Sequence, residues 1–144
     1  MSKEIWRNIE GYDNRYMVSS MGRVMAKPYR YMRKNPAGFI SEYVRKPVVL
    51  KQNELNGYKR VCLSNSGAKN VLVHRLVAEA FIPNPDMLPE VNHKNWNRSD
   101  NRVENLEWCT VQQNRQRRLA LKSRSDNRSA EATAALRWKP DNSP

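Results

Sequence analysis

The chain has little cysteine, with only Cys62 and Cys109 among its 144 residues. The two cysteines lie in separate segments and neither belongs to a Cys-x-x-Cys pair, so they do not make a zinc site. A chain without a disulfide framework is expected in a reducing compartment. Cys109 follows Trp108 at the end of a short apolar run, where a free cysteine most simply fills a small buried space.

Long apolar runs are also missing. No stretch approaches the ~20 residues of a membrane-spanning helix, and the N-terminus from Met1 to Trp6 lacks the apolar segment of a secretory signal. Hydrophobic residues make up 39% of the chain and the mean hydropathy is −0.88, so the core must be modest. We therefore expect small modules joined along an extended path, in a cytoplasmic protein without a membrane partner.

Acidic residues are the third shortage. There are 14 Asp and Glu against 26 Lys and Arg, which gives a net charge of +12 and a pI near 10.1. Such an excess attracts polyanions, and nucleic acid is the leading partner. A basic surface kept only for solubility is the weaker alternative. Membrane binding would need a helix with a wide apolar face, and the most basic stretch, Asn114–Arg128, has little apolar surface.

Residues 1–27 mix aromatic and β-branched side chains with turn signals at Gly11, Asn14 and Gly22. This mixture predicts a small module of short antiparallel strands. Its aromatic residues most simply fill the core of the module. The arginines are better candidates for contacts with DNA phosphates, and they are Arg7, Arg15 and Arg23.

Residues 28–56 begin with a basic, tyrosine-containing stretch from Pro28 to Pro47. Prolines and Gly38 interrupt any regular pattern there, so an irregular basic loop or insertion is expected. Two interpretations stay open. Either its alternating aromatic and cationic side chains lie in a groove of DNA, or the loop is simply solvated.

Residues 57–122 have the clearest periodicity in the chain. The segment Gly57–Ser64 alternates like a strand, with Val61 and Leu63 on one face. An amphipathic helix then ends before Pro83 and Pro85, and its apolar positions are Val73, Leu76, Val77, Ala80 and Phe81. Its apolar stripe should pack beneath the hairpin that follows.

That hairpin is predicted by two strand candidates on either side of a polar turn from Trp96 to Asn101. Thr110 then opens a basic helix, with Gln113 at the capping-box position, that runs to about Lys122. The segment Glu90–Arg118 is therefore a ββα unit.

Residues 123–144 form a basic tail in this interpretation. An alanine-rich patch from Ala130 to Leu136 predicts one more short helix there. The charge run that leads into the tail is either solvated or lies on DNA, and the charge of the whole chain favours DNA.

The order of residues in the ββα unit resembles the HNH nuclease motif of phage-borne homing endonucleases. The resemblance is carried by Val91-Asn92-His93, Asn101-Arg102-Val103-Glu104-Asn105-Leu106-Glu107-Trp108 and Asn114. A second set of residues resembles the DNA-binding module often fused N-terminal to such nucleases, namely Trp6, Gly11-Tyr12, Tyr16-Met17-Val18-Ser19 and Gly22-Arg23-Val24. The resemblance implies an α+β fold: a small antiparallel β N-terminal module, a ββα-metal nuclease unit and a basic helical C-terminal tail.

The resemblance also implies roles for single residues. His93 would be the general base, and Asn105 the middle asparagine that ties the hairpin together. Asn92 and Asn114 would bind one divalent metal ion, Mg²⁺ or Mn²⁺. The family often has Asp at the position of Asn92, and an amide oxygen, which carries no formal charge, should hold the ion less tightly.

Hydrolysis of a phosphodiester requires an in-line nucleophile, relief of charge on the phosphoryl oxygens and stabilisation of the departing 3′-oxygen. A divalent ion can do the last two, and a histidine with a pKa of about 6.5 can take a proton from water at pH 7. Asn92 and His93 are adjacent on a strand, so their side chains share one site only if the strand twists or bulges near its end. A backbone carbonyl is expected to fix the tautomer of His93.

Around this site the amphipathic helix and the basic helix supply further polar residues. His74 lies at the edge of the apolar stripe, where a structural role is more common than a catalytic one. The candidate DNA contacts in this part of the chain are Arg75, Arg115, Arg117 and Arg118.

We therefore predict a metal-dependent HNH homing-type endonuclease that hydrolyses duplex DNA at a preferred site, as a monomer or homodimer, inside a cell such as a phage-infected bacterium. One such site cuts one strand, so a double-strand break would need a dimer or two events. The alternative is a DNA-binding protein that keeps the HNH scaffold with weak or no cleavage. A basic RNA-associated protein explains the charge but leaves the order of residues from His93 to Asn114 unexplained.

Overall fold

Four short strands form an antiparallel sheet in the N-terminal part of the protein, for which the computed structural model describes residues 3–137. The strands are β1 (Trp6–Asn8), β2 (Tyr16–Ser19), β3 (Val24–Ala26) and β6 (Val48–Val49), in the order β1-β2-β3-β6. The prediction of short antiparallel strands in this module is therefore confirmed, and the sheet also takes a strand from beyond residue 27.

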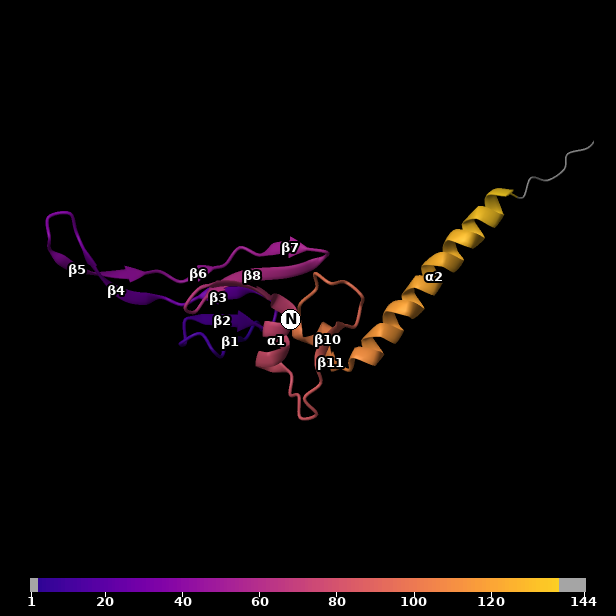
Figure 1. Ribbon diagram of the computed structural model, residues 1–144, viewed down its shortest axis with the longest axis horizontal. Coiled ribbons are helices and arrows are strands. Elements are labelled where there is room, and N and C mark those ends of the chain that lie inside the picture. Colours follow the sequence, from indigo (N-terminus) through magenta and orange to yellow (C-terminus); the bar gives the residue numbers. More distant parts are fainter. Residues whose placement is uncertain (1–2, 138–144) are drawn as a thin grey trace, which may run out of the picture.

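Between β3 and β6 the chain leaves the sheet and forms a separate hairpin of β4 (Tyr29–Lys34) and β5 (Ile40–Arg45). We call Tyr29–Arg45 the arm, and it projects from the body of the protein (Figure 1). The expectation of an irregular loop here is wrong. Prolines bracket the hairpin or lie in its turn, where no ladder hydrogen bond is lost, and Gly38 takes a φ of +90° in that turn.

A three-stranded sheet follows, with β7 (Asn53–Leu55), β8 (Tyr58–Ser64) and β9 (Ala68–Leu72) in chain order. The predicted alternation along β8 is confirmed, because Val61 and Leu63 are fully buried while Cys62 is exposed. The buried face of this sheet therefore packs into the core.

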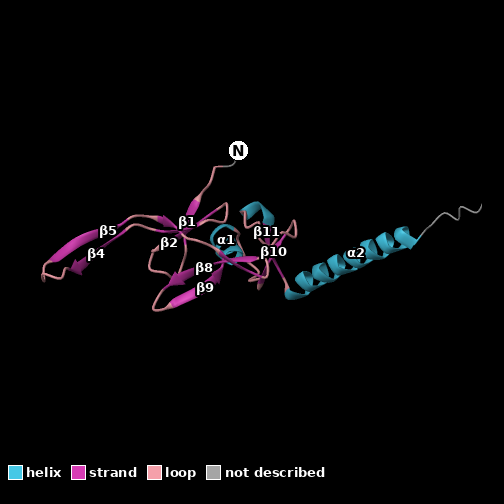
Figure 2. Cartoon of the chain, turned by 90° about the horizontal axis from the view of Figure 1, so that it is seen from above, coloured by secondary structure: helices cyan, strands magenta, loops and turns pink. Residues whose placement is uncertain are grey.

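Helix α1 (Val73–Phe81) lies at the centre of the fold and confirms the predicted amphipathic helix. It contacts β1 and β2 on one side and β8, β9, β10 and β11 on others, so it joins the N-terminal and C-terminal sheets (Figure 2). The core around it is small and continuous, and includes Val18, Val24, Val61, Leu63, Val73, Val77 and Leu106. Burial of these aliphatic side chains is the main stabilising contribution to the body of the protein.

The predicted ββα unit is confirmed. Strand β10 (Glu90–His93) pairs antiparallel with β11 (Leu106–Cys109), a 3-10 turn η1 (Val103–Asn105) lies between them, and α2 (Val111–Arg137) follows. The capping box is formed as expected: the Thr110 hydroxyl accepts a bond from the Gln113 N–H at 3.1 Å, and the Gln113 side-chain oxygen accepts one from the Thr110 N–H at 3.0 Å.

Helix α2 differs from the prediction because it continues without a break to Arg137. The expected end near Lys122 and the separate short helix over Ala130–Leu136 are therefore wrong. Trp138 and the residues after it lie outside the described residues. The helix projects from the body at the end opposite the arm (Figure 1, Figure 2).

The α+β class is confirmed by these mixed sheets and helices. Within residues 3–137, no helix combines the length and the apolar character that crossing a membrane requires.

Candidate active site

One small hollow brings together three residues that the sequence predicts to act together. Asn92 and His93 at the end of β10, and Asn114 in the first turn of α2, line a space of about 90 Å³. Although Asn92 and His93 are adjacent in a strand, both border this space, and His93 is the last residue of β10. We call it the His93 hollow, and its other walls are formed by Tyr58, Val91, Trp96, Arg98, Arg118 and Leu121.

The orientation of the His93 ring is fixed by Asn101. The two side chains are 6% and 4% exposed, and His93 Nε2 lies 2.8 Å from Asn101 Oδ1. An amide oxygen only accepts hydrogen bonds, so this contact places the proton on Nε2 and leaves a free lone pair on Nδ1. The expected backbone carbonyl is thus replaced by a side chain.

Asn101 is itself held by the N-terminal module. A Cβ on Gly22 would lie 2.9 Å from the Asn101 Cβ, and Gly22 has a φ of +86°. The backbone N–H of Val103 also donates to the Ser20 carbonyl at 3.0 Å. The close approach requires glycine at position 22, so the turn after β2 sets where the loop of the ββα unit lies.

Asn105 ties the two ends of that loop together. Its Oδ1 accepts from the Asn95 N–H at 3.0 Å, and its Nδ2 donates to Asn95 Oδ1 at 2.9 Å and to the Asp100 carbonyl at 2.8 Å. All of its polar atoms are used inside the protein, and it is not among the residues lining the His93 hollow. Its contacts hold the loop that carries Asn101 rather than reaching into the hollow.

The Asn92 amide is oriented by a carboxylate across the hairpin. Asn92 Nδ2 donates to Glu107 Oε1 at 3.0 Å, and Glu107 is the residue paired with Asn92 in the strand register. The same carboxylate forms an ion pair with Arg117 of α2. The Asn92 amino group is therefore occupied, and the amide oxygen lies on the side of the amide away from Glu107.

Asn114 is oriented in the same way. Its Nδ2 donates to the carboxylate of Glu90, which also lies 3.9 Å from the Arg118 guanidinium. Among residues 3–137, neither Asn92 Oδ1 nor Asn114 Oδ1 accepts a hydrogen bond. The amide oxygens of two residues that line the hollow are thus free to coordinate a cation or to accept a hydrogen bond.

A second histidine lies against the first. The His74 ring centroid is 5.1 Å from that of His93 and 5.3 Å from that of Tyr58. Burial lowers the pKa of His74 to about 4, with smaller contributions from His93 and Arg75. Burial also lowers the pKa of His93, against the opposing effect of its bond to Asn101. Both imidazoles are therefore neutral at pH 7.

His74, which the sequence places at the edge of the apolar stripe, carries a buried ring nitrogen that is left unbonded within residues 3–137. His74 is 5% exposed, and its Nδ1 has no hydrogen-bond partner among the described residues. His74 borders a second hollow of about 170 Å³, which shares Tyr58, Asn114 and Arg118 with the His93 hollow.

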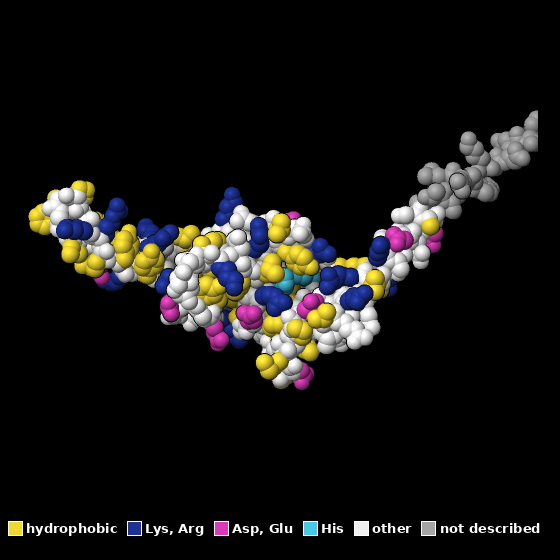
Figure 3. Space-filling view, in the orientation of Figure 1, with side chains coloured by type: hydrophobic (Ala, Val, Ile, Leu, Met, Phe, Trp, Pro, Cys, Tyr) yellow, Lys and Arg dark blue, Asp and Glu magenta, His cyan; other side chains and the backbone are white. Residues whose placement is uncertain are grey.

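Arginines of the ββα unit and α1 lie around the two hollows. Arg118 lines both, Arg75 lines the second and donates to the Pro89 carbonyl at 3.0 Å, and Arg115 is exposed on α2. Histidine atoms reach the surface near the centre of the molecule, with Lys and Arg side chains beside them (Figure 3). Cations thus border the candidate site, while Arg117 is paired with Glu107.

The N-terminal arginines are engaged within the protein. Arg7 donates to the Ala80 carbonyl at 2.8 Å, and Arg23 forms an ion pair with Glu4. Arg15 forms a longer pair, 3.4 Å, with an aspartate two residues before it. Contact of these three with DNA remains a prediction, and for Arg7 and Arg23 it would compete with existing bonds.

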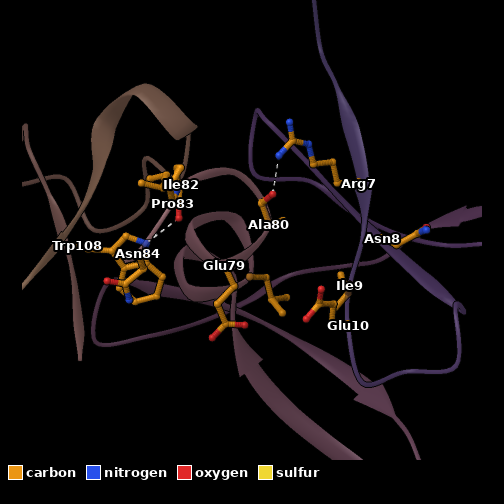
Figure 4. Close-up of a pocket in the computed structure, with 11 residues that line it drawn as sticks. Arg7, Asn8, Ile9, Glu10, Glu79, Ala80, Ile82, Pro83, Asn84 and Trp108 are labelled. Carbon is orange, nitrogen blue, oxygen red and sulfur yellow. Dashed lines mark hydrogen bonds between the residues drawn. The ribbon is translucent and has the colours of Figure 1, made fainter. Parts of the chain in front are cut away.

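A cavity of about 570 Å³, larger than either of these two hollows, lies elsewhere in the fold. It lies where β1 faces the end of α1 and Trp108 (Figure 4). Its polar lining includes Arg7, Glu10, Glu79 and Asn84, and none of the residues that line the His93 hollow. Size alone would have pointed away from the candidate site.

Comparison with known proteins finds two family matches along the chain. Residues 4–64 match the NUMOD4 motif and residues 71–116 match the HNH endonuclease model. The protein belongs to the HNH endonuclease family, with a NUMOD4 motif ahead of the HNH unit, as the sequence predicted.

Similar proteins come from viruses and phage. Two uncharacterized HNH endonucleases of Acanthamoeba polyphaga mimivirus are 36% and 38% identical over 71% and 77% of this chain, which covers 26% and 25% of their lengths. The DNA endonuclease I-HmuI of Bacillus phage SP01 is 32% identical over 73% of this chain and 52% of its own. The chain thus spans between a quarter and about half of these relatives.

A solved structure is also similar. It concerns DNA binding and cleavage by the HNH homing endonuclease I-HmuI, and it superposes with a TM-score of 0.62 at 27% identity, over 88% of this chain and 66% of that one. The fold is therefore shared with a homing endonuclease.

Proposed function

We propose that the protein is a metal-dependent, site-preferring DNA endonuclease of the HNH homing type, which hydrolyses phosphodiester bonds in duplex DNA. The observation that carries the proposal is the meeting of Asn92, His93 and Asn114 at one hollow. They come from two elements, and each has a side-chain atom left unbonded by the described protein.

The donor atoms suit a hard divalent cation such as Mg²⁺ or Mn²⁺. Asn92 and Asn114 would hold it through Oδ1, because Glu107 and Glu90 already take their amino groups. When bound, such an ion relieves charge on the phosphoryl oxygens and stabilises the departing 3′-oxygen. The carboxylates that orient the two amides are themselves paired with Arg117 and Arg118, so the amide oxygens would hold the ion without a charged ligand beside them.

His93 would act as the general base through Nδ1. Its neutral ring can accept the proton of a water molecule at pH 7, and Asn101 holds the ring while that happens. Arg118 and Arg98 at the hollow would attract the phosphate. Asn105 would act indirectly, by holding the loop that positions Asn101.

Duplex DNA is the partner that the charge favours. The net charge of +12 and the exposed arginines of α2 would supply phosphate contacts, so binding should weaken steeply with salt. One hollow of this kind would cut one strand, and a double-strand break would need two copies or two events.

A plasmid-nicking assay tests the proposal. Purified protein should convert supercoiled DNA to the nicked form with Mg²⁺ or Mn²⁺ and not with EDTA. His93→Ala should slow cleavage by about 10²- to 10⁴-fold, because a general base contributes that much, with unchanged DNA binding and circular dichroism. Met87→Ala, in an exposed loop, is the matched control and should cut like the wild type. Equal cutting by His93→Ala would reject the base assignment.

One observation favours the alternative of a DNA-binding protein with weak or no cleavage. Both candidate ligand positions, Asn92 and Asn114, carry amides rather than carboxylates. Salt-dependent DNA binding without cleavage under any divalent ion would support that alternative and reject the nuclease.

A further inference from the structure

The arm has two faces of different chemistry. In the strand register Tyr29 opposes Arg45, Tyr31 opposes Tyr43, and each such pair lies on one side of the ribbon. We call this side the tyrosine–arginine face, and its members are Tyr29, Tyr31, Arg33, Ser41, Tyr43 and Arg45. The opposite side, the mixed face, consists of Arg30, Met32, Lys34, Ile40, Glu42 and Val44.

Charge separates the two faces. The only carboxylate between Tyr29 and Arg45 is Glu42, and it forms a 3.2 Å ion pair with Arg30 on the mixed face. The tyrosine–arginine face therefore has two guanidinium groups and no acid. Anions should approach it more readily than the mixed face.

The tyrosines make the face rigid and keep it exposed. The Tyr31 ring lies 5.6 Å from that of Tyr43 and 5.7 Å from that of Tyr29, measured between centroids. The three side chains are nevertheless 39–48% exposed, because the arm stands away from the core (Figure 1). Such stacking lowers the entropy lost when a partner covers the face.

We propose that the tyrosine–arginine face of the arm binds duplex DNA beside the place of cleavage. This proposal rests on the proposed function, because it takes DNA as the substrate. A two-stranded ribbon fits the major groove of B-DNA. Each strand has six residues, which gives an arm ~20 Å long, enough to follow about six base pairs.

The positions of the two arginines agree with phosphate contacts. Arg33 is four residues from Tyr29, the partner of Arg45, so the two charges are ~13 Å apart along the ribbon. The tyrosine rings between them already contact one another, which favours their packing against a groove over stacking on single-stranded bases.

Two double variants test the proposal, because each removes two positive charges from a different face. The first is Arg33→Ala with Arg45→Ala, and the matched control is Arg30→Ala with Lys34→Ala. Binding of the full chain to a labelled mixed-sequence duplex is measured in EDTA over a range of salt, with circular dichroism to check folding. Loss of two phosphate contacts should weaken binding by roughly 10- to 100-fold at moderate salt and reduce the salt slope by about 1.8. The control should change neither beyond a fewfold general charge effect.

Conservative replacement and competition complete the test. Arg33→Lys with Arg45→Lys should restore most of the affinity, because phosphate recognition needs the charge. Equal losses in the two alanine variants, or no loss in either, would overturn the proposal. Stronger competition by single-stranded DNA or by structured RNA than by duplex DNA would also overturn it. Since binding is measured without metal, a protein that fails to nick plasmid can still show the difference between the faces, and a protein that nicks can fail to show it.

Discussion

Residues 3–137 contain two β-hairpins that lie outside the larger sheets, and the two differ in burial and in hydrogen bonding of their side chains. In the hairpin of β10 and β11, which we call the HNH hairpin, polar side chains such as Asn101 and Asn105 are buried and bonded. In the arm, β4 and β5, all twelve residues of the strands are exposed. The same backbone motif can thus hold polar side chains in fixed positions where other elements cover it, or present them to solvent where nothing covers it.

The cost of burial explains why the loop of the HNH hairpin is so extensively bonded. A buried polar group without a partner costs about 1–3 kcal/mol, and Asn105 and Asn101 both have partners beneath the loop. The resulting network holds His93 in one orientation. The arm has no such requirement, because water satisfies its polar groups.

The largest expected effect is a loss of stability, and it is tested by replacing one asparagine in each hairpin. Asn105→Ala removes three hydrogen bonds from a residue that is 6% exposed, and should lower the free energy of unfolding by roughly 3–4 kcal/mol. Asn35→Ala, in the exposed turn of the arm, removes one bond to the Phe39 N–H and should cost less than about 1 kcal/mol. Urea unfolding measures both, and equal losses would contradict the distinction between the hairpins.

The second prediction concerns the pH dependence of stability, because the HNH hairpin packs on the buried His74 and the arm contains no histidine. The pKa of His74 is about 4 in the folded protein against 6.5 when unperturbed. Its neutral form is favoured by folding, so stability is complete above pH 6.5 and falls as the pH decreases towards 4, by about 3 kcal/mol.

Urea unfolding at several pH values checks this for the wild type and for His74→Gln. In His74→Gln the free energy of unfolding should change much less between pH 6.5 and pH 4 than in the wild type, whatever the stability of the variant at pH 7. An unchanged decrease would assign the effect to other groups, such as His93.

The third prediction separates positioning from packing inside the HNH hairpin. Asn101→Ala should reduce cleavage by about 10- to 100-fold, as expected for a residue that orients a reactive group. It removes the bond that raises the pKa of His93, so the acidic limb of the pH–rate profile should move to lower pH. Asn101→Asp should move that limb to higher pH, because a carboxylate stabilises the protonated ring. Profiles that coincide with the wild type would show that Asn101 only fills space.

Local patterns predicted a large part of this structure. The apolar spacing from Val73 to Phe81 gave α1, and Thr110 with Gln113 placed the start of α2, because both signals depend on neighbours in sequence. The family resemblance predicted that Asn92, His93 and Asn114 share one site. Those three residues do line one hollow.

The features that were missed depend on contacts that sequence does not reveal. Proline and Gly38 indicated a loop, although in the arm they occupy its ends and turn. Asn101 is the partner of His93 because of its position next to Gly22. Gly22 is distant in the sequence but lies against the Cβ of Asn101 in the fold. The sequence predicted a backbone carbonyl in this role, and Asn95 and Asn97 lie in the same turn as Asn101, so only the fold identifies Asn101.

In the function proposed above, the amide oxygens of Asn92 and Asn114 hold one divalent cation beside His93. The most direct measurement is a titration of the full chain with Mn²⁺, following free Mn²⁺ by electron paramagnetic resonance, for the wild type, Asn114→Ala and Asn92→Asp. Our account predicts one strong site that weakens tenfold or more in Asn114→Ala and tightens by about tenfold in Asn92→Asp, where a charged oxygen replaces a neutral one. Identical titration curves for the three proteins would contradict it.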